Sequence, residues 1–155
     1  MSLRDNLRRD AVSALRTLEP IAMGVEGTVR DAIRLMQDHC VGCVFVTEYS
    51  RPIGVFTERD VLTRIMAGAL PLDTSILEVM TKNPQVITEG NSVANVIQTM
   101  YDGGFRHMPV VDDSGHLTHV VSVKRIVEYL VEHFPSTVFN LPPKPVKSLA
   151  SREGA

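Results

Sequence analysis

The feature that most constrains the fold of this chain is a unit that occurs twice. The first copy contains TVRDAIRLMQD at residues 28–38, and the second contains SVANVIQTMYD at residues 92–102. In both copies an apolar run, a polar turn, a second apolar run and a helical apolar pattern follow in the same order. Such internal similarity indicates repeated structural units that bury their apolar faces against each other.

Each copy predicts a helix, a β-hairpin and a second helix. Thr28 and Ser92 precede apolar residues spaced three and four apart, so each is expected to cap a helix. Gly103 and Gly104 are expected to end the helix of the second copy. Apolar runs on either side of a polar turn are typical of a hairpin. One such unit cannot bury its small sheet alone, so we predict an α/β fold in which two pseudo-symmetric repeats, each a small sheet with packed helices, lie face to face.

The repeat also sets the expected domain boundaries. Residues 1–17 carry leucine and alanine at helical spacing and predict an amphipathic leading helix. The first repeat then covers residues 18–75, and residues 76–134 comprise a linker, with a short helix at 76–80, and the second repeat. The tail, residues 135–155, carries four prolines and is expected to be extended or disordered.

Composition excludes several classes of protein. Hydrophobic residues make up 44% of the chain, which is enough for a core. The formal net charge is −2 with both signs scattered, so nucleic acid is not an expected partner. The longest apolar runs, such as residues 41–47, are too short to cross a membrane, and two cysteines cannot make a disulfide scaffold. We therefore expect a cytoplasmic protein with no membrane partner.

Thr57 and Asp60 are the first candidate ligand-binding residues. Thr57 is expected where a strand becomes a helix, and the free N–H groups at a helix start favour a phosphate. The Thr57 hydroxyl would add a donor, and the Asp60 carboxylate can accept hydrogen bonds from both ribose hydroxyls, as acidic residues do in dinucleotide-binding folds. The same spacing also fits a capping box that only closes the helix start, and both interpretations stay open.

Three segments resemble a known family. They are GVFTERD at residues 54–60, VMTKNP at 79–84 and FRHMPVVD at 105–112. Together with the duplication, they make the chain similar, from about residue 18 to residue 134, to a tandem pair of cystathionine-β-synthase-type (CBS) domains, or Bateman module, of the stand-alone bacterial type. The resemblance implies an α/β fold with two clefts, in which an adenine nucleotide (AMP, ADP or ATP) binds and regulates a separate effector protein. No cofactor is required for this role.

The resemblance also implies which residues of the second copy complete the nucleotide site. The strand entry Val86, Ile87 and Thr88 would offer backbone groups and an apolar wall to the adenine. Arg106 and His107 align with positions that reach the phosphates, and an arginine can hold phosphate oxygens in pairs. Without the family pattern, Arg106 fits a solvated surface residue and His107 a hydrogen-bonded strand residue equally well.

The second cleft departs from this pattern. Ser122 matches the threonine of the first copy, but Arg125 stands where the first copy has its aspartate. The ribose acceptor is thereby replaced by a cation. Ala22, Met23 and Gly42 are expected to line this cleft together with Ser122 and Arg125. We therefore predict a second, weaker cleft that stays empty or takes an anion.

Two further hypotheses compete with nucleotide binding. Cys40 and Cys43 form a CxxC motif, but it follows a helix and enters a strand, whereas thioredoxin-like chemistry needs the motif at a helix start. Structural zinc needs four ligands and no second CxxC occurs, so no metal site is predicted. A thiol or metal sensor built on these cysteines is one alternative. An assembly module with vestigial clefts is the other.

The sequence also bears on catalysis and assembly. No nucleophile elbow, Walker loop or HExxH motif occurs, so we predict that the chain is not an enzyme. The second helix of each copy carries apolar residues, at 61–66 and 126–131, which one pair of repeats cannot hide. A large exposed apolar face usually marks an interface, so we expect a homodimer.

Overall fold

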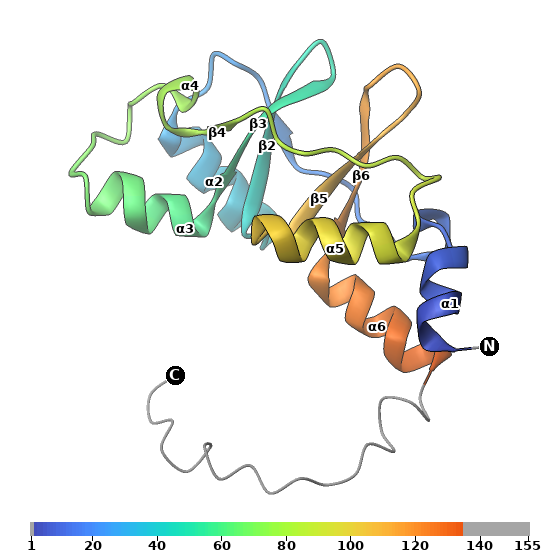
Figure 1. Ribbon diagram of the computed structural model, residues 1–155. Coiled ribbons are helices and arrows are strands. Elements are labelled where there is room, and N and C mark those ends of the chain that lie inside the picture. The colour runs from blue at the N-terminus through green and yellow to red at the C-terminus, as the bar shows by residue number, and fades with distance from the viewer. Residues whose placement is uncertain (1, 135–155) are drawn as a thin grey trace, which may run out of the picture.

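The computed structural model describes residues 2–134, and its elements run through the repeat twice (Figure 1). The α-helices are α1 (Leu3–Arg9), α2 (Val29–His39), α3 (Glu58–Asp60), α4 (Ile76–Val79), α5 (Val93–Gly103) and α6 (Val123–His133). A 3₁₀ helix, η1 (Val12–Ala14), and a π-helix, η2 (Val61–Met66), complete the helical set. The strands are β1 (Ala22–Met23), β2 (Cys43–Glu48), β3 (Arg51–Thr57), β4 (Thr81–Lys82), β5 (His107–Val111) and β6 (Leu117–Ser122). The predicted tail, residues 135–155, lies outside the described residues.

Short polar residues fix where the helices begin. Thr28 caps α2 through a capping box, since its hydroxyl accepts from the N–H of Asp31 and the Asp31 carboxylate accepts from the N–H of Thr28. Ser92 caps α5 by accepting from the N–H of Asn95 at 3.1 Å. Gly104 ends α5 with a φ of 68°, a left-handed conformation that glycine adopts without steric cost. The predicted caps are confirmed.

The two hairpins form the centre of the molecule. β2 and β3 pair antiparallel in a sheet of order β1-β2-β3-β4, and β5 and β6 form the equivalent antiparallel pair. The hairpins lie side by side in Figure 1, with α2 beside β2 and α5 drawn across the lower ends of β5 and β6. A backbone hydrogen bond from Leu117 N to Ser50 O, 2.8 Å long, joins one hairpin to the other. The predicted α/β fold with two repeats is confirmed.

Each repeat is completed by the segment that precedes the other repeat in the chain. Leu18 pairs with Val120 of β6 through two backbone hydrogen bonds of 3.0 Å, so the segment before the first repeat joins the sheet of the second. In the same way β4 pairs with β3, and the buried residues of α4 pack in the core of the first repeat. Residues 76–82, which we predicted to begin the linker before the second repeat, pack on the first repeat.

Three apolar clusters follow from this exchange. One core fills each repeat, and the core of the second repeat includes Val12 and Leu15 from the leading segment. A third, smaller cluster of Cys43, Phe45 and Val120 packs between the hairpins. Burying apolar side chains across this contact stabilises one repeat against the other, at about 25 cal/mol per Å² of apolar surface. The hairpins are thus held as a pair, and this pairing positions the site.

The leading segment is not the single helix that its spacing predicts. Helix α1 ends at Arg9, because the backbone of Asp10 turns extended (φ −75°, ψ 136°). From there the chain is bound to the second repeat: Val93 N donates to Asp10 O and Val12 N donates to Asn91 O, both at 2.8 Å. Pairing with a neighbouring element outweighs helical periodicity here. The predicted helix over 1–17 is wrong beyond its first two turns.

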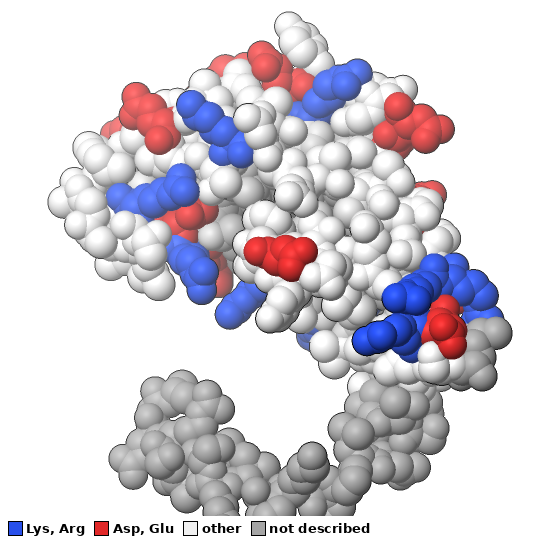
Figure 2. Space-filling view, viewed as in Figure 1, with Lys and Arg blue, Asp and Glu red and all other residues white. Residues whose placement is uncertain are grey.

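The surface carries both signs of charge. Figure 2 shows acidic and basic side chains mixed over the visible face, with the densest basic group over α1, where Arg4, Arg8 and Arg9 lie. Within residues 2–134, no helix combines the length and apolar character needed to span a bilayer.

Candidate functional site

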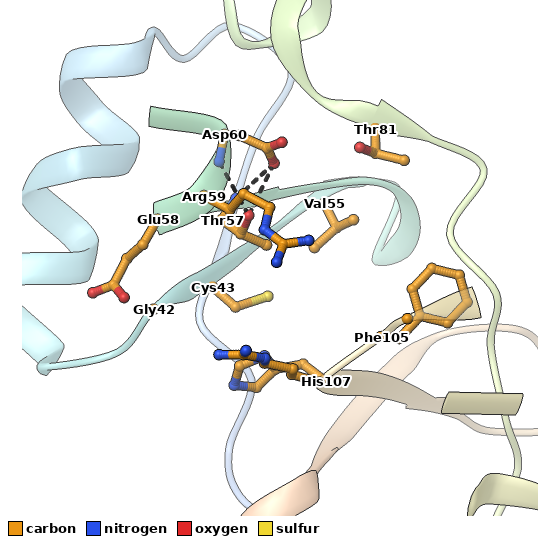
Figure 3. Close-up of a pocket in the computed structure, with 12 residues that line it drawn as sticks. Gly42, Cys43, Val55, Thr57, Glu58, Arg59, Asp60, Thr81, Phe105 and His107 are labelled. Carbon is orange, nitrogen blue, oxygen red and sulfur yellow. Dashed lines mark hydrogen bonds between the residues drawn. The ribbon is translucent and has the colours of Figure 1, made fainter. Parts of the chain in front are cut away.

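Two cavities lie between the repeats, on either side of a wall that both repeats build. The first has a volume of about 310 Å³ and the second about 530 Å³, which are sizes typical of small-molecule sites. Charged and polar side chains from both repeats line the first cavity (Figure 3); they are Thr57, Glu58, Arg59, Asp60, Thr81, Arg106 and His107. Four residues predicted for the nucleotide site are therefore brought together: Thr57, Asp60, Arg106 and His107.

Thr57 and Asp60 form a capping box at the start of α3. The Asp60 carboxylate accepts from the Thr57 N–H at 3.0 Å and from the Thr57 hydroxyl at 3.2 Å, while the Asp60 N–H donates to the same hydroxyl oxygen. The Thr57 hydroxyl proton is thus used on Asp60, and the hydroxyl is not the extra phosphate donor that we expected. Capping and cavity lining are both realised, since the two residues also line the first cavity.

The second oxygen of Asp60 is held by a side chain that the sequence analysis missed. Arg64, on the π-helix η2, places its Nε 3.4 Å from Asp60 Oδ1. Its guanidinium also donates to the carbonyl of Val79 at 2.5 Å and to the Thr81 hydroxyl at 3.2 Å. Arg64 therefore ties the carboxylate to β4 on the opposite side of the first cavity. A carboxylate has about four acceptor positions, so Asp60 keeps capacity for a ligand hydroxyl.

The cations of the first cavity come from both repeats. Figure 3 shows the Arg59 side chain reaching into the space between Thr57 and Val55, opposite His107. Burial and the positive charge of Arg106 lower the pKa of His107, while Glu58 acts in the opposite direction. His107 is therefore neutral at neutral pH, and the arginines supply the permanent charge. Arg59 could have been found as a basic residue in the first turn after the cap.

The residues predicted to contact the adenine lie outside both cavities. Val86, Ile87 and Thr88 line neither of the two cavities. Ile87 instead pairs with the strand β5, since its N–H donates to Pro109 O at 3.0 Å, and its side chain is 97% buried in the core of the second repeat. The segment that reaches the first cavity is β4, which contributes Thr81 to its lining.

The second cavity also differs from its prediction. Ser122 and Gly42 line it as expected, but Ala22, Met23 and Arg125 do not. Ala22 and Met23 form β1, paired with β2, and Met23 is buried in the core of the first repeat. Lys124 and Arg106 supply cations to this cavity.

Arg125 turns away from the second cavity. Its guanidinium lies 2.8 Å from the Glu128 carboxylate, an ion pair one turn further along α6. The Ser122 oxygen accepts from the Arg125 N–H at 3.4 Å, and among the described residues no acceptor takes the Ser122 hydroxyl proton. The replacement of the aspartate by arginine thus leaves a free hydroxyl donor in the second cavity, where the first has a carboxylate.

The two cysteines differ in environment. Cys40 is exposed at the end of α2 with a φ of 52°, and Cys43 is buried at the start of β2. Burial, with the nearby negative charge of Asp60, raises the pKa of Cys43 to about 12, so this thiol stays protonated at neutral pH. Within residues 2–134 no group of three or more His, Cys, Asp or Glu side chains is arranged to hold a metal ion.

The comparison with known families decides which family this is. The model of the CBS domain matches residues 12–67 and again residues 76–132. This chain belongs to the CBS domain family. The predicted tandem pair is confirmed, and the matched ranges include the segments that the two repeats exchange.

Relatives with this domain pair differ in length and context. An uncharacterized 17.7 kDa protein of Acidianus ambivalens is 28% identical over 122 residues, covering 78% of this chain and 73% of that protein. A CBS domain-containing protein of Arabidopsis thaliana is 27% identical over 139 residues, covering 88% of this chain and 25% of that protein. The chain thus spans about a quarter of the plant relative, in which the pair is one part of a larger protein.

Solved CBS domain proteins share the fold. A CBS domain protein from Pyrobaculum aerophilum, complexed with AMP, superimposes with a TM-score of 0.70 at 25% identity, covering 79% of this chain and 98% of that chain. A CBS domain pair in complex with 5′-methylthioadenosine and S-adenosyl-L-methionine has a TM-score of 0.70 at 21% identity, covering 77% of this chain and 98% of its own.

Proposed function

We propose that this CBS pair is a regulatory module that binds an adenine nucleotide, AMP, ADP or ATP, in the cavity at Thr57 and Asp60. The observation that carries the proposal is the convergence of one buried carboxylate and two arginines, from different repeats, on a single cavity of about 310 Å³. A ribose needs an acceptor and a phosphate needs fixed cations, and this cavity offers both. Ligand binding between the repeats links the two halves of the chain.

Different lining residues bind the ribose, the phosphate and the base of the nucleotide. Asp60 accepts from one ribose hydroxyl with the capacity that Thr57 and Arg64 leave free. Arg59 and Arg106 hold the phosphate, and neutral His107 adds a hydrogen bond. Val55 and Phe105 supply apolar surface to the base, in place of the strand entry that we expected. A solved CBS domain protein complexed with AMP supports the choice of an adenine nucleotide as the ligand.

A regulatory role is proposed because the chain belongs to the CBS domain family. The described residues hold the CBS pair and the leading segment, so the output must pass to another protein or to another part of a longer chain. A ligand can change that output only if it binds one state of the pair more tightly than the other. Because the cavity walls come from both repeats, closure of one repeat on the other is the motion that a bound nucleotide favours.

A thermal-shift screen tests nucleotide binding directly. AMP, ADP, ATP, S-adenosylmethionine and NAD are each added to the protein, and the melting temperature is measured. A ligand present at one hundred times its Kd stabilises the folded state by about 2.7 kcal/mol. We expect at least one of AMP, ADP and ATP to raise the melting temperature. The absence of any shift would favour the alternative of an assembly module with vestigial clefts.

We also propose that the pair forms a homodimer through η2 and α6. Ile65 and Ile126 of these helices point into the cores, but Leu62, Met66 and Val127 are exposed by 61%, 67% and 50% of their surfaces. Both helices lie on the lower side of the molecule as Figure 1 is drawn. A second copy placed on this face would bury all three side chains, and closed two-fold pairs are the commonest way to do so.

A further inference from the structure

The two cavities share one wall. Gly42, Cys43, Arg106 and His107 line both the first and the second cavity. Figure 3 shows Cys43 and His107 facing each other across the junction of the repeats. A side chain in this wall can therefore contact a ligand on either side, and the chemistry of the wall decides whether the cavities act independently.

The wall is symmetric in its backbone. In the first repeat the carbonyl of Gly42 accepts from Glu58 N at 3.1 Å, and in the second the carbonyl of Arg106 accepts from Val123 N at 3.0 Å. Each of these bonds ties the wall to the first residue of a helix that borders a cavity. Gly42 and Arg106 thus occupy equivalent positions in the two repeats.

The wall is asymmetric in its charge. Gly42 has no side chain, the Cys43 thiol is protonated because burial raises its pKa to about 12, and the lowered pKa of His107 leaves that ring neutral at neutral pH. Arg106 is therefore the single permanent cation of the four shared wall residues. A second cation at the equivalent position, Gly42, would have given each cavity a wall cation of its own.

Each cavity also has a cation of its own, in the first turn of the helix that borders it. Arg59 lines the first cavity alone, and Lys124 lines the second alone. The second cavity adds the free Ser122 hydroxyl as a donor. The carboxylates of Glu58 and Asp60 also line the first cavity and that of Glu19 lines the second, so an anion bound in either cavity depends on Arg106 as its second fixed cation.

We propose that Arg106 is the shared anion contact of the two cavities, and that an anionic ligand bound in one cavity weakens anion binding in the other. The guanidinium turns toward the occupied side, and the second ligand then loses a charge-assisted contact. This coupling deepens the proposed nucleotide binding and rests on it. Losing one hydrogen bond to a charged group corresponds to about tenfold in affinity, and linkage makes the effect reciprocal.

An NMR titration with AMP tests the coupling cavity by cavity. The amide of Arg59 reports the first cavity and the amide of Lys124 reports the second, since each residue lines just one of them. Thr81 is exposed and lines only the first cavity, so Thr81→Trp is used to fill that cavity; a thermal melt checks its fold, because Thr81 also accepts a hydrogen bond from Arg64. AMP affinity at the second cavity is measured in the wild type, with the first cavity saturated, and in Thr81→Trp. We expect it to be about tenfold tighter in Thr81→Trp.

The same comparison in an Arg106→Ala background identifies the residue responsible. With Arg106 absent, the second cavity is expected to bind AMP equally with the first cavity saturated or filled by tryptophan. Arg59→Ala is the matched control, because it removes an arginine from one cavity only and should keep the difference. Three results would overturn the coupling alone. The second cavity could bind AMP equally in the wild type and in Thr81→Trp, or the difference between them could persist in the Arg106→Ala background. The third is a Thr81→Trp variant whose second cavity binds no AMP. No AMP at either cavity of the wild type would overturn nucleotide binding and the coupling with it.

Discussion

Removal of the Asp60 carboxylate distinguishes a role in nucleotide binding from a role in helix capping alone. The comparison is possible because the chain carries another capping box of the same geometry. Thr28 and Asp31 at the start of α2 make the three hydrogen bonds that Thr57 and Asp60 make at the start of α3, with lengths within 0.1 Å of each other: 2.9, 3.1 and 3.3 Å against 3.0, 3.2 and 3.3 Å. Asp31 lines neither of the two cavities between the repeats. Asp31→Ala is therefore the matched control for Asp60→Ala.

The two substitutions should differ in binding far more than in stability. Each loses its part of a capping box, worth about 1 kcal/mol of folding free energy, and Asp60→Ala also leaves Arg64 without its carboxylate. For the ligand, a hydrogen bond from a ribose hydroxyl to a charged acceptor contributes about 1.5–3 kcal/mol, which corresponds to roughly ten- to a hundredfold in affinity. We expect Asp60→Ala to weaken AMP binding by at least about tenfold and Asp31→Ala to leave it unchanged.

Calorimetric titration of AMP into the three proteins measures this difference, and thermal melts show that each variant is folded at the titration temperature. Asp60→Asn adds a conservative variant, since its amide oxygen can still accept from Thr57 while the charge is lost. We expect Asp60→Asn to bind AMP with an affinity between those of wild type and Asp60→Ala. Equal affinity of the wild type and Asp60→Ala would refute the assignment of the ribose to this carboxylate.

Three further results follow from the structure. Arg125→Ala should leave the tight AMP affinity unchanged, because Arg125 pairs with Glu128 and lines neither cavity; a large loss in calorimetry would contradict this. Light scattering at micromolar concentration should give twice the chain mass of 17.1 kDa, and Leu62→Glu on the exposed face should give the monomer mass, whereas a monomeric wild type would exclude the dimer. Between pH 7 and 9 a thiol reagent should modify Cys40 well before Cys43, since the raised pKa of the buried thiol keeps it protonated throughout this range; peptide mapping that found Cys43 modified first would contradict its burial.

Local signals predicted most of the fold. Thr28, Ser92 and Gly104 act through hydrogen bonds within their own helices, so their positions in the sequence are enough to place the helix ends. The internal repeat then predicts the two hairpins and their pairing. The leading helix failed because residues 10–18 bind to residues more than 70 positions away, such as Asn91 and Val120, and spacing along one segment cannot report such a partner.

Site residues that lie close together in one segment could be predicted from the sequence, whereas contacts between distant segments could not. Thr57 and Asp60 lie three residues apart, and their spacing alone predicts the capping box that the structure contains. Val86, Ile87 and Thr88 were predicted to line the first cavity because the sequence does not reveal that β4, rather than the next extended segment, pairs with the first repeat. Arg64 was missed for a similar reason, since its role depends on contacts with Val79 and Thr81 in the linker.

A crystal structure of the protein grown with saturating AMP would show whether, and in which orientation, the nucleotide occupies the first cavity. We predict AMP in the first cavity, with a ribose hydroxyl within hydrogen-bond distance of the Asp60 carboxylate and the phosphate between Arg59 and Arg106. AMP bound with its ribose away from Asp60, or a first cavity without AMP at a concentration that saturates the thermal shift, would contradict this prediction.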